Sequence, residues 1–328
     1  MKKDIIQKLK TFPQKTILVI GDVMVDAYIW GKVNRISPEA PVPVLSISHR
    51  ENRLGGAANV GLNLLSLSAK PIICSVIGED EKGKIFLELL KKQNLTTDGI
   101  ITSELRKTTS KTRVISSGQH LLRVDEEITN PLNAEIEKNF ISHIIAILKH
   151  NSIDAIIFED YDKGCISPNL INEIVSFANN KNIPVTVDPK KTNFLEYKNI
   201  SIFKPNLLEL REGMKMDLPK SNPQEINNAA NLLLTEKNHS NIIVTLSEYG
   251  IYVTDGNKWE IFPAEKRDIV DVSGAGDTVI AVATLCIAAG IGIFETARIA
   301  NIAGGLVCEK VGVVPIERNE LFDEFDRS

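Results

Sequence analysis

The stretch that decides the fold is Asp271-Val272-Ser273-Gly274-Ala275-Gly276-Asp277-Thr278, which runs directly into an apolar segment rich in Ala and Ile. Its two glycines let the backbone turn sharply and approach a ligand, and the first turn of the following helix offers free N–H groups to an anion such as phosphate. A carboxylate beside a bound phosphoryl group is a poor ligand but a suitable general base. We therefore predict that Asp277 activates an attacking hydroxyl. The backbone N–H groups of Gly274, Ala275 and Gly276 are expected to stabilise the charge on the transferring group.

The alternative interpretation of this segment is a glycine turn in which Asp277 and Thr278 only cap a buried helix. Hydride transfer with a nicotinamide cofactor is disfavoured, because the dinucleotide fingerprint needs a third glycine where Val279 stands. Residues 278–294 carry no charge, but they are fewer than the ~20 residues of a membrane span and contain two glycines. We expect a buried core helix there.

Composition excludes several classes of protein. The 328 residues are 43% hydrophobic and 24% charged, which is ordinary for a globular protein, and the net charge of −4 gives no footprint for nucleic acid. The four cysteines are scattered without metal-ligand spacing, which predicts a reducing compartment. Residues 1–15 hold no continuous hydrophobic segment, so no secretory signal is expected. These features predict a cytoplasmic protein with a small-molecule ligand and no membrane partner.

Hydrophobic periodicity predicts alternating strands and helices along most of the chain. Strands separated by helices of this length are typical of an α/β fold with a mostly parallel sheet covered on both faces, where ligands gather at the carboxyl ends of the strands. The expected strands are residues 16–20, 71–77, 155–158, 184–187, 201–203 and 242–246, and the expected helices are residues 54–67, 82–92, 134–148, 169–178 and 224–234.

Two segments depart from this alternation. Residues 28–48 and residues 110–124, with a turn at Ser117-Gly118, have the pattern of antiparallel β structure. We expect them to form a small β-ribbon lid. The apolar alternation of the ribbon also favours dimerisation through the lid.

Polar groups that suit a sugar follow the first strand and begin the first long helix. Asp22 and Asp26 are placed to accept hydrogen bonds from sugar hydroxyls, although Asp22 could instead shape the turn. Gly55 and Gly56 allow close approach of the backbone, and Asn59 follows as an amide that both donates and accepts. The alternative for this second motif is tight helix packing.

Two further motifs suit a nucleotide. Asn206 and Glu209 lie three residues apart in Asn206-Leu207-Leu208-Glu209, on one face of a helical turn, where they could organise Mg²⁺ mostly through water or simply form a capping box. Thr245-Leu246-Ser247-Glu248-Tyr249-Gly250 follows a strand as a polar turn. Such a turn suits an ATP phosphate through its hydroxyls and backbone.

A second phosphate, on the substrate, would need cations. The candidates are Arg113 and Arg123 in the second ribbon segment, and Lys163 and Lys190 after strands. For each of them, ordinary solvation at the surface is the alternative.

In their order along the chain, Gly55-Gly56, Asn206 to Glu209 and Asp271 to Thr278 resemble the motifs of the ribokinase-like, or PfkB, carbohydrate kinases. The resemblance spans nearly the whole chain and implies one kinase domain, residues 1–328, with a three-layer fold. It implies that Asp277 is the catalytic base, that Gly274 to Gly276 supply the anion hole, and that the Asn-x-x-Glu motif works with Mg²⁺ and ATP. It also implies that the helix holding Asn301 lines the adenine pocket.

The segments 34–44, 55–60 and 121–125 resemble more closely the members of this family that phosphorylate D-glycero-β-D-manno-heptose 7-phosphate at its anomeric oxygen, on the way to ADP-heptose. Such kinases are often fused to an adenylyltransferase with a His-x-Gly-His motif, and none of the five histidines here lies in one. The resemblance therefore implies the kinase module, with adenylyl transfer left to a separate protein. A monovalent cation near Asp271, a kinase for another sugar, sugar phosphate or nucleoside, and a non-catalytic binding regulator stay open at this point.

Overall fold

The larger of two sheets forms the centre of the molecule. The computed structural model describes residues 2–220, 222–265 and 267–327, and within them this sheet has nine strands. In spatial order the strands are β13 (Trp259–Phe262), β12 (Ile251–Thr254), β11 (Ile242–Thr245), β10 (Ile202–Phe203), β9 (Val185–Asp188), β8 (Ala155–Glu159), β1 (Thr16–Gly21), β4 (Lys70–Gly78) and β5 (Ile100–Ser103).

Pairing in this sheet is parallel from β11 to β5, and only β12 runs antiparallel to its two neighbours. The predicted mostly parallel sheet is therefore present. Because parallel strands end at the same edge, β1, β8, β9 and β10 bring their last residues together. We call this the carboxyl edge.

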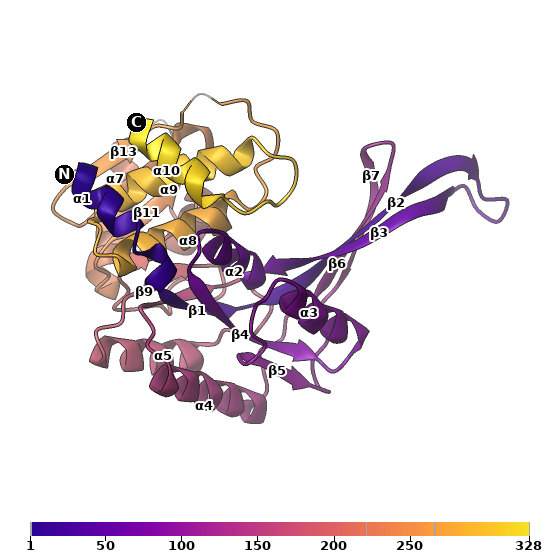
Figure 1. Ribbon diagram of the computed structural model, residues 1–328, viewed down its shortest axis with the longest axis horizontal. Helices are drawn as coiled ribbons and strands as arrows, with labels where there is room; N and C mark the ends of the chain where they lie inside the picture. The colour runs from indigo at the N-terminus through magenta and orange to yellow at the C-terminus, as the bar shows by residue number, and fades with distance from the viewer. Residues whose placement is uncertain (1, 221, 266, 328) are drawn as a thin grey trace.

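Helices cover both faces of the sheet, as the layers in Figure 1 show. Alternate residues of β1 enter different cores: Ile17 and Val19 pack on one face, and Leu18 and Ile20 on the other. The first face is covered by α1 (Lys2–Leu9), α2 (Ala57–Ser66), α3 (Glu81–Lys92), α8 (Ala275–Ala288), α9 (Ile293–Cys308) and α10 (Arg318–Arg327). The second is covered by α4 (Ala134–His150), α5 (Pro168–Asn180), α6 (Leu207–Met214) and α7 (Pro223–Lys237).

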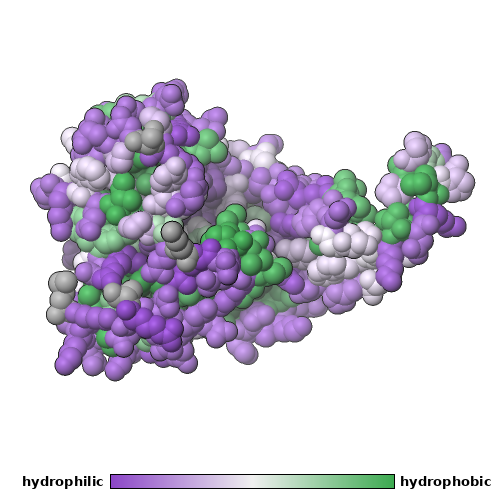
Figure 2. Space-filling view, turned by 90° about the horizontal axis from the view of Figure 1, so that it is seen from above, coloured by the Kyte–Doolittle hydropathy of each residue, from purple (hydrophilic) through white to green (hydrophobic). Residues whose placement is uncertain are grey.

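The smaller sheet projects from the body as a long arm in Figure 1. Its strands are β3 (Pro43–Gly56), β2 (Val23–Ile36), β6 (Ser110–Ser116) and β7 (Gln119–Glu126), in that spatial order. The pairs β2–β3 and β6–β7 are antiparallel, whereas β2 and β6 are parallel. Apolar residues are exposed on this arm, and Figure 2 shows hydrophobic surface there; they include Ile36, Val42, Ile47, Leu121, Leu122 and Val124.

The ribbon segments are longer than the sequence predicts. The first spans residues 23–56, and the expected turn between β6 and β7 is formed by Ser117 and Gly118, both with positive φ angles of 51° and 79°. Such a pair of left-handed residues suits the twist of a tight hairpin.

Two predicted helix boundaries are wrong. The helix expected from residue 54 begins at Ala57, because Leu54 to Gly56 pair with β2 as the end of β3. The uncharged helix expected over residues 278–294 ends at Ala288, and Gly290, with φ of 73°, turns the chain before α9 begins. No helix within the described residues has both the length and the apolar character needed to cross a bilayer.

Candidate active site

The glycine segment begins helix α8 beside the carboxyl edge. Gly274 precedes the helix with φ of 79°, a left-handed conformation that glycine adopts without strain. A Cβ added at Gly276 would stand 3.8 Å from both Asp188 Oδ2 and Lys204 Nζ. The first turn of α8 therefore lies against the ends of β9 and β10.

The three backbone N–H groups expected to bind a phosphoryl group differ in whether they already have a hydrogen-bond acceptor. The N–H of Ala275 donates to the carbonyl oxygen of Val272 at 3.3 Å. The N–H groups of Gly274 and Gly276 have no acceptor within the described part of the chain. Free N–H groups at the start of a helix attract anions, so Gly274 and Gly276 are the donors best placed for a phosphoryl group.

Asp277 is buried on the first turn of α8, with 9% of the residue exposed. Its Oδ2 accepts a hydrogen bond from Asn59 Nδ2 at 2.6 Å, and its Oδ1 accepts one from the Tyr161 hydroxyl at 3.0 Å. Burial raises the pKa of Asp277 to about 6, although these two hydrogen bonds oppose the rise. A carboxylate with a pKa near the working pH is well suited to act as a general base.

Asp277 belongs to a group of three carboxylates with Glu159 and Asp188, which we call the acidic cluster. One oxygen of each lies within 4.8 Å of the others. Burial, followed by the charge of Asp188, raises the pKa of Glu159 well above its usual value. Burial acts in the same direction on Asp188, but Lys190 and Lys204 outweigh it and hold the pKa of Asp188 below its usual value.

The acidic cluster has the donor set of a hard divalent cation. Mg²⁺ prefers carboxylate oxygens and retains several waters, and Glu159 Oε2 is buried without a hydrogen-bond partner in the described structure. These residues therefore fit Mg²⁺ on the side of the site that faces Lys204 and Lys190.

Asn206 and Glu209 form a capping box, which is the alternative to a role with Mg²⁺ that the sequence left open. Asn206 Oδ1 accepts from the Glu209 N–H at 2.9 Å, and Glu209 Oε2 accepts from the Asn206 N–H at 2.8 Å. Glu209 Oε1 also pairs with Lys190 Nζ. Their water-mediated role with Mg²⁺ stays a prediction, and both stand at the start of α6, close to the acidic cluster through Lys190.

The other expected nucleotide residues divide into core and surface positions. Leu207 is buried in the core of the second face, which argues against contact with ATP, whereas Leu208 is 60% exposed. Thr245 ends β11 and Ser247 and Glu248 lie in the turn that follows, where Glu248 pairs with Lys220 at the surface. Gly250 closes this turn with φ of 90°. Asn301 Nδ2 donates to the carbonyl oxygens of Phe262 and Pro263 and so ties α9 to the end of β13.

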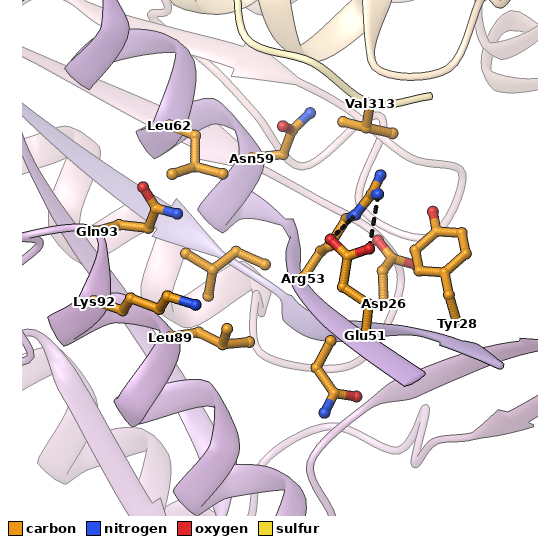
Figure 3. A pocket seen from close by; sticks show the side chains of 12 residues that line it. Asp26, Tyr28, Glu51, Arg53, Asn59, Leu62, Leu89, Lys92, Gln93 and Val313 are labelled. Atoms are coloured by element: carbon orange, nitrogen blue, oxygen red, sulfur yellow. Dashed lines mark hydrogen bonds and ion pairs between the residues drawn. The ribbon is translucent and has the colours of Figure 1, made fainter. Parts of the chain in front are cut away.

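On the opposite side of Asp277 a cavity of about 270 Å³ lies between the arm and helices α2 and α3. Asp26 and Asn59 line it, together with Arg53 from β3 and Val313 from the loop after α9 (Figure 3). Gly55 lies against Asp26, and Gly56 precedes α2 with φ of 62°. The expected sugar-side residues Asp26, Gly55, Gly56 and Asn59 therefore lie around the start of α2, and Asn59 connects them to Asp277.

Asp22 is separated from this group by its own hydrogen bonds. Its Oδ2 accepts from the N–H groups of Tyr161 and Lys163, and its Oδ1 accepts from the N–H of Cys165, each at 3.0 Å. Asp22 is also only 3% exposed. The structure thus favours the alternative in which Asp22 shapes the loop after β8, and the expected contact with substrate is not supported.

The four expected cations lie in different places. Arg113 pairs with Asp26 beside the cavity, and Lys163 Nζ pairs with Glu127 Oε1 at 2.9 Å. Arg123 is on the exposed face of β7, with its Nε 3.0 Å from Asp125 Oδ1. Lys190 pairs with Asp188 and Glu209 and does not line the cavity.

The carboxylate of Asp271 is occupied by backbone donors. Its Oδ1 accepts from the Ser273 N–H at 2.9 Å and its Oδ2 from the Gly312 N–H at 3.0 Å. Asp271 therefore joins the glycine segment to the loop after α9. The monovalent cation expected near it stays a prediction.

Four residues of this site are not predicted by the sequence motifs: Glu159, Tyr161, Asp188 and Lys204. Each follows or ends a buried strand, which is the signal that could have found them. Lys204 Nζ is 2.7 Å from Asp188 Oδ2, and the Lys204 side chain is 2% exposed. A fully buried lysine is rare unless it is paired with an acidic group, so this buried ion pair is a distinctive feature of the site.

Comparison with known proteins identifies the family of the chain. The family model described as pfkB family carbohydrate kinase matches residues 14–319. The curated relatives include the Bifunctional protein HldE of Helicobacter pylori strain G27, 40% identical over 91% of this chain, and that of Helicobacter hepaticus, 37% identical over 93%. The chain spans only 64% and 62% of the length of these two relatives.

Solved structures share the fold at low sequence identity. Phosphofructokinase-2 from Escherichia coli in complex with potassium aligns with a TM-score of 0.77 at 18% identity, covering 95% of this chain and 98% of that one. Ribokinase from Arabidopsis thaliana complexed with ribose and ATP aligns with a TM-score of 0.72 at 17% identity, covering 96% and 99%. The expected ribokinase-like fold and the expected enzyme class are confirmed, and the chain belongs to the pfkB family of carbohydrate kinases.

Proposed function

We propose that this protein transfers the γ-phosphoryl group of ATP to the anomeric 1-OH of D-glycero-β-D-manno-heptose 7-phosphate. The product would be the 1,7-bisphosphate, a precursor of ADP-heptose and the lipopolysaccharide core. The HldE relatives support this substrate, at 40% identity for the Helicobacter pylori protein. The adenylyl transfer that follows in such a pathway is assigned to a separate catalytic module.

One observation carries the chemical part of the proposal. Asn59 lines the cavity and also donates its hydrogen bond to Asp277, so the carboxylate stands between the cavity and the start of α8. A hydroxyl at this end of the cavity would reach the base, and a phosphoryl group would reach the free N–H groups of Gly274 and Gly276. This arrangement supports the proposal of in-line transfer.

In the proposed mechanism the Asp277 carboxylate takes the proton from the sugar hydroxyl as its oxygen attacks the γ-phosphorus. The new O–P bond forms while the bond between the β,γ-bridging oxygen and the γ-phosphorus breaks, and ADP leaves. Backbone donors and Lys204 would face the charge on the transferring group, where a well-placed donor is worth ~3 to 4 kcal/mol. Glu159 and Asp188 would hold Mg²⁺, which would supply positive charge to neutralise the phosphates.

The test of this function is ATP-dependent release of ADP, with Mg²⁺, across a panel of acceptors. The panel holds D-glycero-D-manno-heptose 7-phosphate, fructose 6-phosphate, ribose, fructose and adenosine. We expect strong selectivity for the heptose phosphate. Selective turnover of another acceptor would replace the substrate and keep the kinase, whereas ATP binding without turnover of any acceptor would contradict the proposal.

The pH dependence of kcat/KM should report Asp277 in the free enzyme. Since the base must be ionised, activity is full above its pKa and is lost as the pH falls through about 6. Tyr161→Phe removes one hydrogen bond that stabilises the carboxylate, so the acid limb should move to higher pH, by roughly half a unit to one unit.

The measurement is a pH–rate profile from pH 5 to 8 for the two proteins. Tyr252→Phe is a matched control, because the Tyr252 hydroxyl bonds with Asn227 in the core of the second face. An acid limb that does not move in Tyr161→Phe, or that moves equally in Tyr252→Phe, would contradict the role of this hydrogen bond.

We also propose that the arm acts as a lid and as the dimer contact. Its exposed residues Ile36, Val42 and Ile47 are apolar, and a second copy of the arm would cover them. Sedimentation equilibrium should give a dimer, and replacement of Ile36 and Val42 by Ser should shift the mass to that of the monomer. A wild-type monomer at micromolar concentration would rule the contact out.

A further inference from the structure

The cavity beside Asp277 has two distinct ends. Asn59, the partner of Asp277, marks one end. Leu89, Lys92 and Gln93, from the last turn of α3 and the residue after it, mark the other. In Figure 3 the polar ends of Lys92 and Gln93 point into the cavity, across from Arg53 and Glu51. A ligand with its reacting hydroxyl at Asn59 would therefore extend toward α3.

The charged side chains that line this cavity are paired, with one exception. Asp26 pairs with Arg113, and Glu51 holds Arg53 by two hydrogen bonds of 2.7 and 3.0 Å. The Lys92 side chain forms no ion pair or hydrogen bond with the described residues. Its charge contributes to lowering the pKa of Glu51, after the larger effect of the hydrogen bond from Arg53. Lys92 is thus the cation that a ligand can engage without breaking an existing pair.

The chemistry of a sugar phosphate matches this arrangement. When the hydroxyl at one end of the carbon chain reacts, the existing phosphate lies at the opposite end, and it requires a cation there. Of the four cations expected from the sequence, none lines the cavity, and each has a carboxylate partner. A different residue must supply this charge.

We propose that Lys92 binds the phosphate already present on the substrate and makes the enzyme selective for phosphorylated sugars, with the Gln93 amide as a second donor. This inference rests on the proposed function, since it takes the sugar hydroxyl to be at Asp277. The Glu51–Arg53 pair contributes no net charge at the neighbouring wall. The selectivity of the site for an anion therefore depends on Lys92.

The test compares Lys92→Met with wild type, using D-glycero-D-manno-heptose 7-phosphate and fructose 6-phosphate against unphosphorylated fructose. We expect KM for the sugar phosphates to rise about ten- to a hundredfold, the range for loss of a hydrogen bond to a charged group. The kcat, the KM for ATP and any turnover of fructose should be unchanged. Calorimetric binding of heptose 7-phosphate, measured on the same proteins, should weaken by the same factor.

Two variants control for charge and position. Lys91→Met removes a lysine from the same exposed helix end that does not line the cavity, and Lys92→Arg keeps the charge at the proposed position. Lys91→Met should behave as wild type, and Lys92→Arg should recover most of the affinity.

The outcomes separate the two proposals. Turnover of sugar phosphate by wild type with an unchanged KM in Lys92→Met would overturn the phosphate site and leave the proposed function standing. An equal loss in Lys91→Met and Lys92→Met would also overturn it, because surface charge alone would explain the effect. A wild-type enzyme that binds and turns over only unphosphorylated sugars would overturn both.

Discussion

Asp277→Asn should lower kcat by roughly 10²- to 10⁴-fold, the usual contribution of a general base. The amide has the same shape and still accepts a hydrogen bond from Asn59, but it cannot take a proton from a hydroxyl. ATP binding should be retained, because the backbone donors of Gly274 and Gly276 are untouched. The measurements are ADP release under saturating substrates and calorimetric titration with ATP.

Asp268→Asn is the matched control, since Asp268 is an exposed carboxylate on the same segment of chain and should keep full turnover. The stability of Asp277→Asn should not fall, because one of three crowded buried carboxylates loses its charge. Loss of a general base is expected to lower turnover at least ~10²-fold. If Asp277→Asn keeps more than about a tenth of wild-type turnover, the loss is smaller than this and the assignment is wrong.

Lys204→Met should destabilise the protein by about 3 to 5 kcal/mol, the cost of removing one partner of a buried ion pair. Lys204 is fully buried and lies 2.7 Å from Asp188 Oδ2, in the same cluster as Glu159 and Asp277. Without it, the negative charge of Asp188 would be compensated mainly by the more distant Lys190, at 3.5 Å. Urea denaturation at pH 7 measures the change in the free energy of unfolding.

The pH dependence of this difference follows from the lowered pKa of Asp188. The pKa of Asp188 in the folded protein lies below its value in the unfolded chain, because the two lysines outweigh the effect of burial. The stability that ionised Asp188 contributes is therefore present above the unfolded pKa and is lost as the pH falls through the folded pKa. The difference between wild type and Lys204→Met should therefore shrink in acid. Lys191→Met, at an exposed lysine paired with Glu212, should change stability by less than about 0.5 kcal/mol. An equally small change in Lys204→Met would show that the pair is not needed for stability.

Local sequence patterns predicted the main elements of the fold well. The alternation of apolar strands and amphipathic helices, the Ser117-Gly118 turn and the helix after the glycine segment all depend on residues a few positions apart. The errors arose where distant pairing overrode local preference. Leu54 to Gly56 read as part of a helix, but they extend β3 because β2 pairs with them.

For the same reason, the sequence predicted only part of the candidate site. The glycines and Asp277 share one local motif, whereas Tyr161 and Asn59 reach Asp277 from 116 and 218 residues away along the chain. Sequence spacing does not show that the Asp22 carboxylate accepts hydrogen bonds from three backbone N–H groups, or that Lys204 is buried. Burial and pairing of charges are properties of the packed state.

The sequence by itself determined the α/β class and the position of the glycine turn with Asp277 in it, because backbone conformation and helix starts follow from neighbouring residues. Only the tertiary structure decided which side chains surround that carboxylate. It brought Glu159 and Asp188 beside Asp277, paired Lys190 with Asp188 and Glu209, and placed Lys92 in the lining of the cavity. The physical reason is that parallel strands from separate parts of the chain end at one edge, and electrostatic energies there depend on distances in space.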